Sequence, residues 1–157
     1  MRGYDRRAAT AYARRWALGR NPAYYNFAAL GGDCTNFVSQ CLYAGSGIMN
    51  YTPVTGWYYR SAADRTASWT GVEFLYRFLT ENRGSGPFGR VCSARELRAG
   101  DVIQLGDGTG QFYHCLLVLH PGPDPRVAAH DVDSLDRPLS DYAYAIARYL
   151  RIEGVRG

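Results

Sequence analysis

The sequence predicts an α+β fold, because helical patterns fill its first half and strand patterns fill its second half. Asp5 precedes a helical pattern that runs to about Ala17, and Asp33 precedes a second one that stops by Gly47. After Gly100 the hydrophobic period becomes that of β-strands. We therefore expect N-terminal helices packed on a small antiparallel sheet.

The remaining elements follow from local signals. Thr70-Gly-Val-Glu73 fits a capping box, so a third helix is expected from about Gly71 to Glu81. The aromatic segment 48–69 is interpreted as a long loop, and the glycine-rich segment 83–89 as a connector. Strands are expected, with a hairpin between the first two, at 101–105, 112–119, 126–130 and 147–152.

Length and composition indicate one globular domain over residues 1–157, since 46% of the residues are hydrophobic and 20% are charged. No segment approaches the eighteen or so apolar residues of a membrane helix, and the N-terminal segment lacks the apolar block of a secretion signal. We expect no membrane contact and favour a cytoplasmic location, although an export segment could have been trimmed. The net charge of +4 is spread along the chain without a basic stripe, so nucleic acid is not an expected partner.

The four cysteines, Cys34, Cys41, Cys92 and Cys115, do not form a Cys-x-x-Cys motif or a zinc-finger spacing with the histidines. We expect no metal and no cofactor. Cys34 and Cys41 lie seven residues apart in one predicted helix, about 10.5 Å along its axis. This exceeds the Cα separation of about 7 Å that a disulfide tolerates, so Cys41 is interpreted as a packing residue.

Cys34 has two interpretations from the residues alone. A cysteine in the first turn of a helix is favoured as a thiolate, but free cysteines are mostly buried structural residues and the adjacent Asp33 opposes a negative charge. His114, inside a predicted strand, fits a core or pocket histidine as well as a catalytic one. His130 ends the next strand and could orient the His114 ring, a role that Asp131 could also fill.

The order of these residues resembles that of papain-like cysteine hydrolases of the NlpC and CHAP type. Several local motifs are similar to the bacterial putative amidase domain family within that superfamily, over about residues 4–152. They are Asp33-Cys34-Thr-Asn-Phe-Val-Ser-Gln40, Trp57-Tyr58-Tyr59, Ser68-Trp69, Gly100-Asp-Val-Ile-Gln104, Tyr113-His114 and His130 with Arg137-Pro-Leu-Ser140.

This resemblance implies a papain-like fold with Cys34 as nucleophile, His114 as general base and His130 as the orienting residue. It also implies that Cys115 replaces the family's usual serine, and that Tyr24 or Tyr25 could help to hold the oxyanion. Substrate contacts are expected from Asp33 and from two aromatic residues of the 48–69 segment, Trp57 and Tyr58.

Three functions remain open at this point. The first is a cysteine-dependent amidase or peptidase acting on a peptide or peptidoglycan-like substrate. The second is an acyltransferase that uses the same three residues but passes the acyl group to an amine or alcohol. The third is a binding domain for peptide or glycan that keeps the fold without catalysis. The sequence does not predict the oligomeric state.

Overall fold

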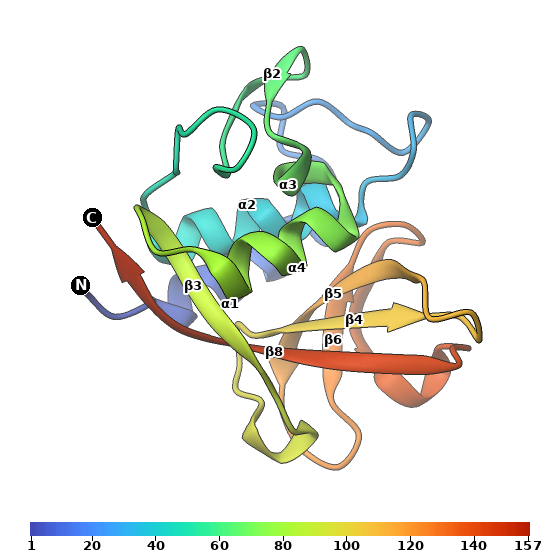
Figure 1. The fold of residues 1–157 in the computed structure, drawn as a ribbon. Coiled ribbons are helices and arrows are strands. Elements are labelled where there is room, and N and C mark those ends of the chain that lie inside the picture. The colour runs from blue at the N-terminus through green and yellow to red at the C-terminus, as the bar shows by residue number, and fades with distance from the viewer.

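The chain folds as three helices packed against one face of a six-stranded antiparallel sheet (Figure 1). The computed structural model describes residues 1–157. The helices that cover the sheet are α1 (Arg6–Trp16), α2 (Cys34–Ser46) and α4 (Val72–Glu81), with a short α3 (Ala67–Thr70) before α4. This confirms the α+β class that the sequence predicts.

The strands of the large sheet lie in the order β3-β8-β4-β5-β6-β7, and every neighbouring pair is antiparallel. Their bounds are β3 (Gly86–Cys92), β4 (Val102–Gly106), β5 (Phe112–His120), β6 (Arg126–Ala129), β7 (Ser134–Pro138) and β8 (Ile146–Arg156). Short 3₁₀ helices occupy Ala94–Glu96 and Leu139–Asp141. The chain ends lie side by side, because Arg2 pairs with Val155 beside the sheet.

Helix α1 begins where the sequence predicts, since the Asp5 side chain accepts a hydrogen bond of 3.0 Å from the Ala8 N–H. Its buried face carries alanines, and Gly45 of α2 lies opposite. A Cβ at Gly45 would lie 3.1 Å from the Cβ of Ala9 and closer still to Tyr4. Small residues on both helices therefore allow α1 and α2 to pack closely.

Helix α2 is the central element of the fold, because nearly all of its side chains are buried. It ends at Gly47, which has a φ of 69° and donates its N–H to the Tyr43 carbonyl at 2.7 Å. This left-handed C-cap is the helix stop that the sequence predicts. The buried surface of α2 fixes the position of its first residue, Cys34, relative to the sheet.

Alternating residues of β5 face two different clusters, as expected for a strand. Cys115 and Leu117 face the helices and belong to the main core, whereas Leu116 and Val118 belong to a smaller cluster on the other side of the sheet. The sheet therefore separates the helix side, where Cys34 packs, from a second apolar side.

Several local predictions differ from the structure. The 48–69 segment contains a small hairpin, β1 (Tyr59–Ser61) with β2 (Asp64–Arg65), and part of α3. The predicted connector 83–89 enters β3, and β7 was not predicted. The Thr70 capping box is absent, since Gly71 is the N-cap of α4 and no side chain caps it.

None of the helices has the length and apolar character needed to cross a membrane.

Candidate active site

Cys34 is the first residue of α2 and is half-buried at the edge of the helix layer. Asp33, at the N-cap position, makes no side-chain cap hydrogen bond. The first N–H groups of a helix have no partner within the helix. Because Asp33 does not cap them, they remain available to a negative charge that develops next to Cys34.

Burial raises the pKa of the Cys34 thiol above its ordinary value. Three groups act in the opposite direction and favour the thiolate: the Thr35 hydroxyl, which lies 3.8 Å from Sγ, and the backbone N–H groups of Cys115 and Thr35. The carboxylate of Asp131 raises the pKa further. At neutral pH the resting side chain is therefore a neutral thiol.

His114 lies in β5, one residue before Cys115, and its ring centroid is 5.7 Å from that of Tyr142. Tyr142 packs against the cluster on the second side of the sheet, so the His114 ring points to that side. No hydrogen bond joins His114 to Cys34. Burial lowers the pKa of His114 below its ordinary value, against an opposite effect of the Asp131 carboxylate.

The strand edge next to His114 is free of a partner strand. β5 pairs with β4 along its first half, but its pairing with β6 begins only at Leu117. The Cys115 N–H on this free edge is the one that favours the Cys34 thiolate. Cys34 and His114 thus flank the same open strand edge, with the ring and the thiol on different sides of it.

His130 makes no hydrogen bond to His114, although the sequence predicts that it orients that ring. Its Nδ1 lies 2.6 Å from Asp33 Oδ2, and its Nε2 lies 2.9 Å from the Trp16 carbonyl oxygen at the end of α1. The ring also stacks on Phe37 at 4.2 Å. Both ring nitrogens are thus occupied by groups other than His114.

Asp33, for which the sequence predicts a substrate contact, is fully buried and presents no surface to solvent. Its Oδ1 accepts hydrogen bonds of 2.8 Å from the Phe27 N–H and 2.9 Å from Asn36 Nδ2. Burial alone would raise its pKa, but the hydrogen bonds from His130 and Asn36 outweigh this effect and lower the pKa. Asp33 is therefore a buried anion that fixes the start of α2.

Asp131 lies beside the same turn. Its Oδ2 accepts a 2.7 Å hydrogen bond from the Asp33 N–H, and its charge affects both Cys34 and His114. Arg20 lies between three carboxylates, with nitrogen to oxygen distances of 3.4 Å to Asp33, 3.5 Å to Asp131 and 2.8 Å to Asp133. Nothing local in the sequence distinguishes Arg20 from the other arginines, so this position is not predictable from sequence patterns.

Two polar residues of the Asp33 to Gln40 motif, Asn36 and Ser39, have buried partners. Asn36 accepts from Trp69 Nε1 at 3.0 Å and donates to the Tyr25 carbonyl at 3.0 Å. Ser39 accepts a hydrogen bond from Trp57 Nε1 at 3.1 Å. These contacts connect α2 to the segment around α3, so the motif specifies the packing of the helix that carries Cys34.

A family model described as a putative amidase domain matches residues 3–151. The chain belongs to the putative amidase domain family. It is also similar to the uncharacterized protein YhbB of Bacillus subtilis (strain 168), with 38% identity over 136 residues. That alignment covers 83% of this chain but 42% of YhbB, so the chain spans less than half of the relative's length. No solved structure matches the chain.

Trp57 and Tyr58, the aromatic residues expected to contact the substrate, differ in how deeply they are buried in this amidase-family domain. Trp57 is fully buried, with its ring centroid 4.7 Å from that of Trp69, and its role is core packing. Tyr58 is half-buried on the β1–β2 hairpin and donates from its hydroxyl to Asp64 at 3.0 Å. Of the predicted substrate residues, only Tyr58 presents surface to solvent.

The two tyrosines upstream of Cys34, Tyr24 and Tyr25, lie in different surroundings. Tyr24 stacks on Trp69 at 6.1 Å and packs against the helix-side core, as Cys34 does. Burial raises the pKa of Tyr24 to about 12. Tyr25 is 48% exposed, and its ring packs edge-on against Phe27. Neither hydroxyl makes a hydrogen bond to Cys34.

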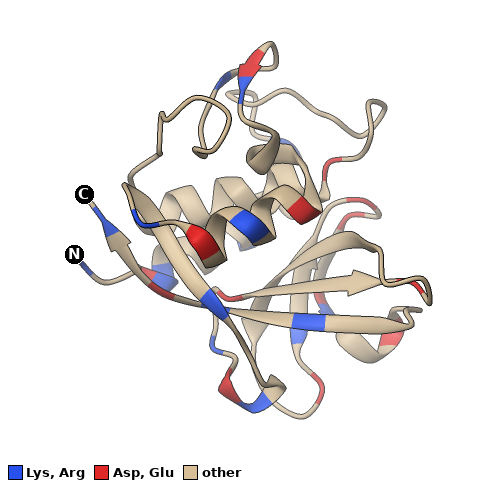
Figure 2. Cartoon of the chain, in the orientation of Figure 1, with Lys and Arg blue, Asp and Glu red and all other residues tan.

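The other predictions about cysteine and histidine concern packing. All four cysteines are free, and Cys41 is fully buried in the apolar core, as predicted. His120 is exposed, and its Nε2 lies 3.6 Å from Asp136 Oδ1. Charged residues are distributed over both layers of the domain (Figure 2).

Proposed function

We propose that this domain is a cysteine-dependent amide-bond hydrolase with a papain-like fold of the NlpC and CHAP type. Cys34 would be the nucleophile and His114 the general base. The observation that carries the proposal is the position of Cys34, half-buried at the uncapped start of α2, next to the free β5 edge that carries His114. Membership of the putative amidase domain family agrees with this activity.

The protonation states of Cys34 and His114 suit an attack in which a base removes the thiol proton. A neutral Cys34 thiol is a weak nucleophile and needs a base to remove its proton, and an imidazole with a lowered pKa is neutral at pH 7 and can accept that proton. The His114 ring must turn around the β5 edge to reach the thiol. Catalytic hydrogen bonds that are absent in a free enzyme often form only with substrate bound.

In the proposed reaction, His114 takes the thiol proton while Sγ attacks the amide carbonyl carbon. The free N–H groups at the start of α2 stabilise the resulting oxyanion. The carbon–nitrogen bond then breaks, His114 returns the proton to the leaving amine, and water hydrolyses the thioester. Asp131, close to both groups, would stabilise the imidazolium that forms in each half of the reaction.

His130 has a different role in this proposal from the one its place in the chain suggests. It would position the nucleophile through Asp33, because its ring joins α1, the start of α2 and the end of β6. Small peptides are the proposed substrates, since a peptide amide supplies the carbonyl and the leaving amine. A cell-wall peptide remains the substrate class that the resemblance favours.

The experiment is mass-spectrometric mapping of iodoacetamide labelling on the native protein, compared for wild type, His114→Ala and His120→Ala. We expect Cys34 to be labelled first, and more slowly in His114→Ala, whereas the exposed His120→Ala control behaves as wild type. Labelling of Cys92 or Cys115 at the rate of Cys34, or no effect of His114→Ala, would contradict the proposed pair.

A second measurement separates hydrolysis from acyl transfer. Peptide amides are incubated with the protein with and without an added amine, and the products are identified by mass. Free acid in both cases supports a hydrolase, and an amine adduct that replaces the acid supports a transferase. A reactive Cys34 with no product from any peptide would favour a binding domain.

A further inference from the structure

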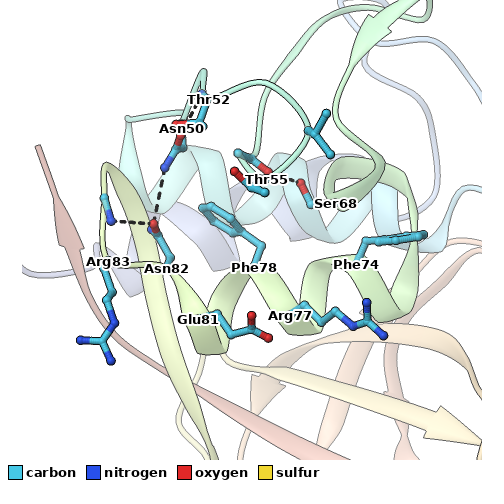
Figure 3. A pocket seen from close by; sticks show the side chains of 13 residues that line it. Asn50, Thr52, Thr55, Ser68, Phe74, Arg77, Phe78, Glu81, Asn82 and Arg83 are labelled. Atoms are coloured by element: carbon cyan, nitrogen blue, oxygen red, sulfur yellow. Dashed lines mark hydrogen bonds between the residues drawn. The ribbon is translucent and has the colours of Figure 1, made fainter.

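A pocket of about 530 Å³ lies along α4, away from Cys34 and His114, neither of which lines it (Figure 3). One wall is a single face of α4, formed by residues spaced three and four apart, as helical periodicity requires. These are Phe74, Arg77, Phe78 and Glu81. The opposite wall is the loop of residues 50–56.

The loop is held in place by hydrogen bonds at both ends. Asn50 donates to the Ser85 carbonyl at 3.0 Å and exchanges two backbone hydrogen bonds with Trp57, at 2.9 and 2.7 Å. The Gly56 carbonyl accepts from the Ser68 hydroxyl at 2.7 Å. The wall opposite α4 is therefore formed before any ligand arrives, which reduces the entropic cost of binding.

Val54, at the tip of this loop, has a strained backbone. Its φ is 67°, and the Thr55 N–H bonds to the Pro53 carbonyl at 2.7 Å across it. This is a γ-turn of the rare type, and a positive φ is unfavourable for a β-branched residue. The side chain is 87% exposed beside the pocket, so packing within the protein does not explain why valine occupies this position.

The charged groups at the pocket are free of partners. The side chains of Arg77, Glu81 and Arg83 make no hydrogen bond or ion pair in the structure. In contrast, Glu73 on the same helix is bound by Arg148 at 2.7 Å. Two arginines against one glutamate give the pocket a net positive charge, and the half-exposed Phe74 adds an apolar surface at its rim.

We infer that this pocket binds an acidic peptide segment. The helix face from Phe74 to Glu81 spans about 10.5 Å, which matches about three residues of extended chain. Arg77 would bind a carboxylate of the ligand, and an apolar side chain next to it would lie between Phe74 and Val54. This site is independent of the proposed amide hydrolysis, because it needs neither Cys34 nor His114.

The test uses a tripeptide blocked at both ends, with glutamate between two leucines, and a matched peptide with glutamine in its place. Binding to the whole wild-type chain is measured by calorimetry and mapped by amide chemical shifts in NMR. We expect shifts at residues 50–56 and 74–84, and binding of the glutamine peptide that is weaker by about tenfold, the loss of one charge-assisted hydrogen bond. Mass spectrometry confirms that the peptides stay intact.

Two variants locate the site. Arg77→Ala is expected to weaken binding of the glutamate peptide by about tenfold, whereas Arg95→Ala, the same change at an exposed arginine outside the pocket, leaves it unchanged. Val54→Gly removes the strained side chain, so we expect a melting temperature that is unchanged or higher together with weaker binding.

Equal affinity for the two peptides, tighter binding of an uncharged oligosaccharide, or no binding at all would overturn the inference. Shifts centred on Cys34 rather than on α4 would also overturn it, because they would place the peptide in the candidate active site. Labelling of Cys34 is measured separately, so a failure of this pocket to bind leaves the proposed function untouched.

Discussion

The carboxylate of Asp33 lies 2.6 Å from Nδ1 of His130, and both side chains are almost completely buried. This contact joins the residue before Cys34 to the residue after β6, 97 positions later in the chain. The second His130 nitrogen bonds to the last residue of α1. One buried pair thus connects the two helices next to the candidate nucleophile with the sheet.

Replacing Asp33 with Asn should destabilise the protein by about 2 kcal/mol or more, because the buried carboxylate accepts hydrogen bonds that a neutral amide cannot fully replace. The amide keeps an oxygen for the Phe27 N–H but loses the charge opposite His130. Urea unfolding followed by circular dichroism measures the change. Asp136→Asn is the control, since Asp136 pairs with Arg14 on the surface, and it should cost less than about 1 kcal/mol. Similar losses in the two variants would contradict the prediction.

The Asp33–His130 pair also predicts that stability depends on pH in the acid range. The pKa of Asp33 is lower in the folded protein than in the unfolded chain, so its contribution is complete above the unfolded value of about 3.9 and is lost as the pH falls through the folded value. Below about pH 4, the free energy of unfolding of the wild type should therefore fall more steeply than that of Asp33→Asn, by up to about 1.4 kcal/mol per pH unit. Urea midpoints across this range test the prediction, and parallel curves would refute it.

Local patterns predicted the elements whose signals lie within a few residues. Asp5 caps α1 and Gly47 ends α2 as expected, and the hairpin of β4 and β5 follows the period of two that the sequence shows. These elements depend on side chains that cap, turn or alternate locally. The prediction failed for β3, because Gly86 and Pro87 are typical of connectors and the strand exists through its pairing with β8 at the sheet edge.

The sequence proposes Cys34, His114 and His130 as site residues, but it does not predict the contacts that the structure gives them. Cys34 and His114 flank one strand edge, yet the partner of His130 is Asp33, and no sequence pattern links positions so far apart. The α2 motif does indicate that some polar residues are buried, because Asn36 and Ser39 lie on a face that also carries apolar residues. Polar residues at such positions indicate buried hydrogen-bond partners.

The proposed mechanism predicts a pH dependence of kcat/KM that reflects a neutral Cys34 and a neutral His114 at rest. Burial raises the pKa of the thiol and lowers that of the imidazole, so kcat/KM should rise with pH through a value below the usual 6.5 or so of histidine and stay level to about pH 8. The ultraviolet absorbance of the thiolate should be small at pH 7. A thiolate already formed at pH 5, as a charged pair would give, is the result that contradicts this prediction.

Serine should replace Cys115 with little cost, although the side chain is fully buried. Gln104 Nε2 already lies 3.5 Å from the Cys115 sulfur, so a hydroxyl there has a donor within reach. We expect the free energy of unfolding to fall by less than about 1 kcal/mol, because a buried hydroxyl with a hydrogen-bond partner is not left unsatisfied. Labelling of Cys34 should keep its wild-type rate.

Cys41→Ser is the matched control for Cys115→Ser. Cys41 is equally buried, but its neighbours in the core are apolar and no side chain donates to its sulfur. A helical serine can donate to the carbonyl four residues earlier, yet its oxygen would still lack a donor, so a loss of about 1–3 kcal/mol is expected. Thermal and urea unfolding of both variants give the comparison. Equal losses would show that Gln104 does not stabilise a hydroxyl at position 115.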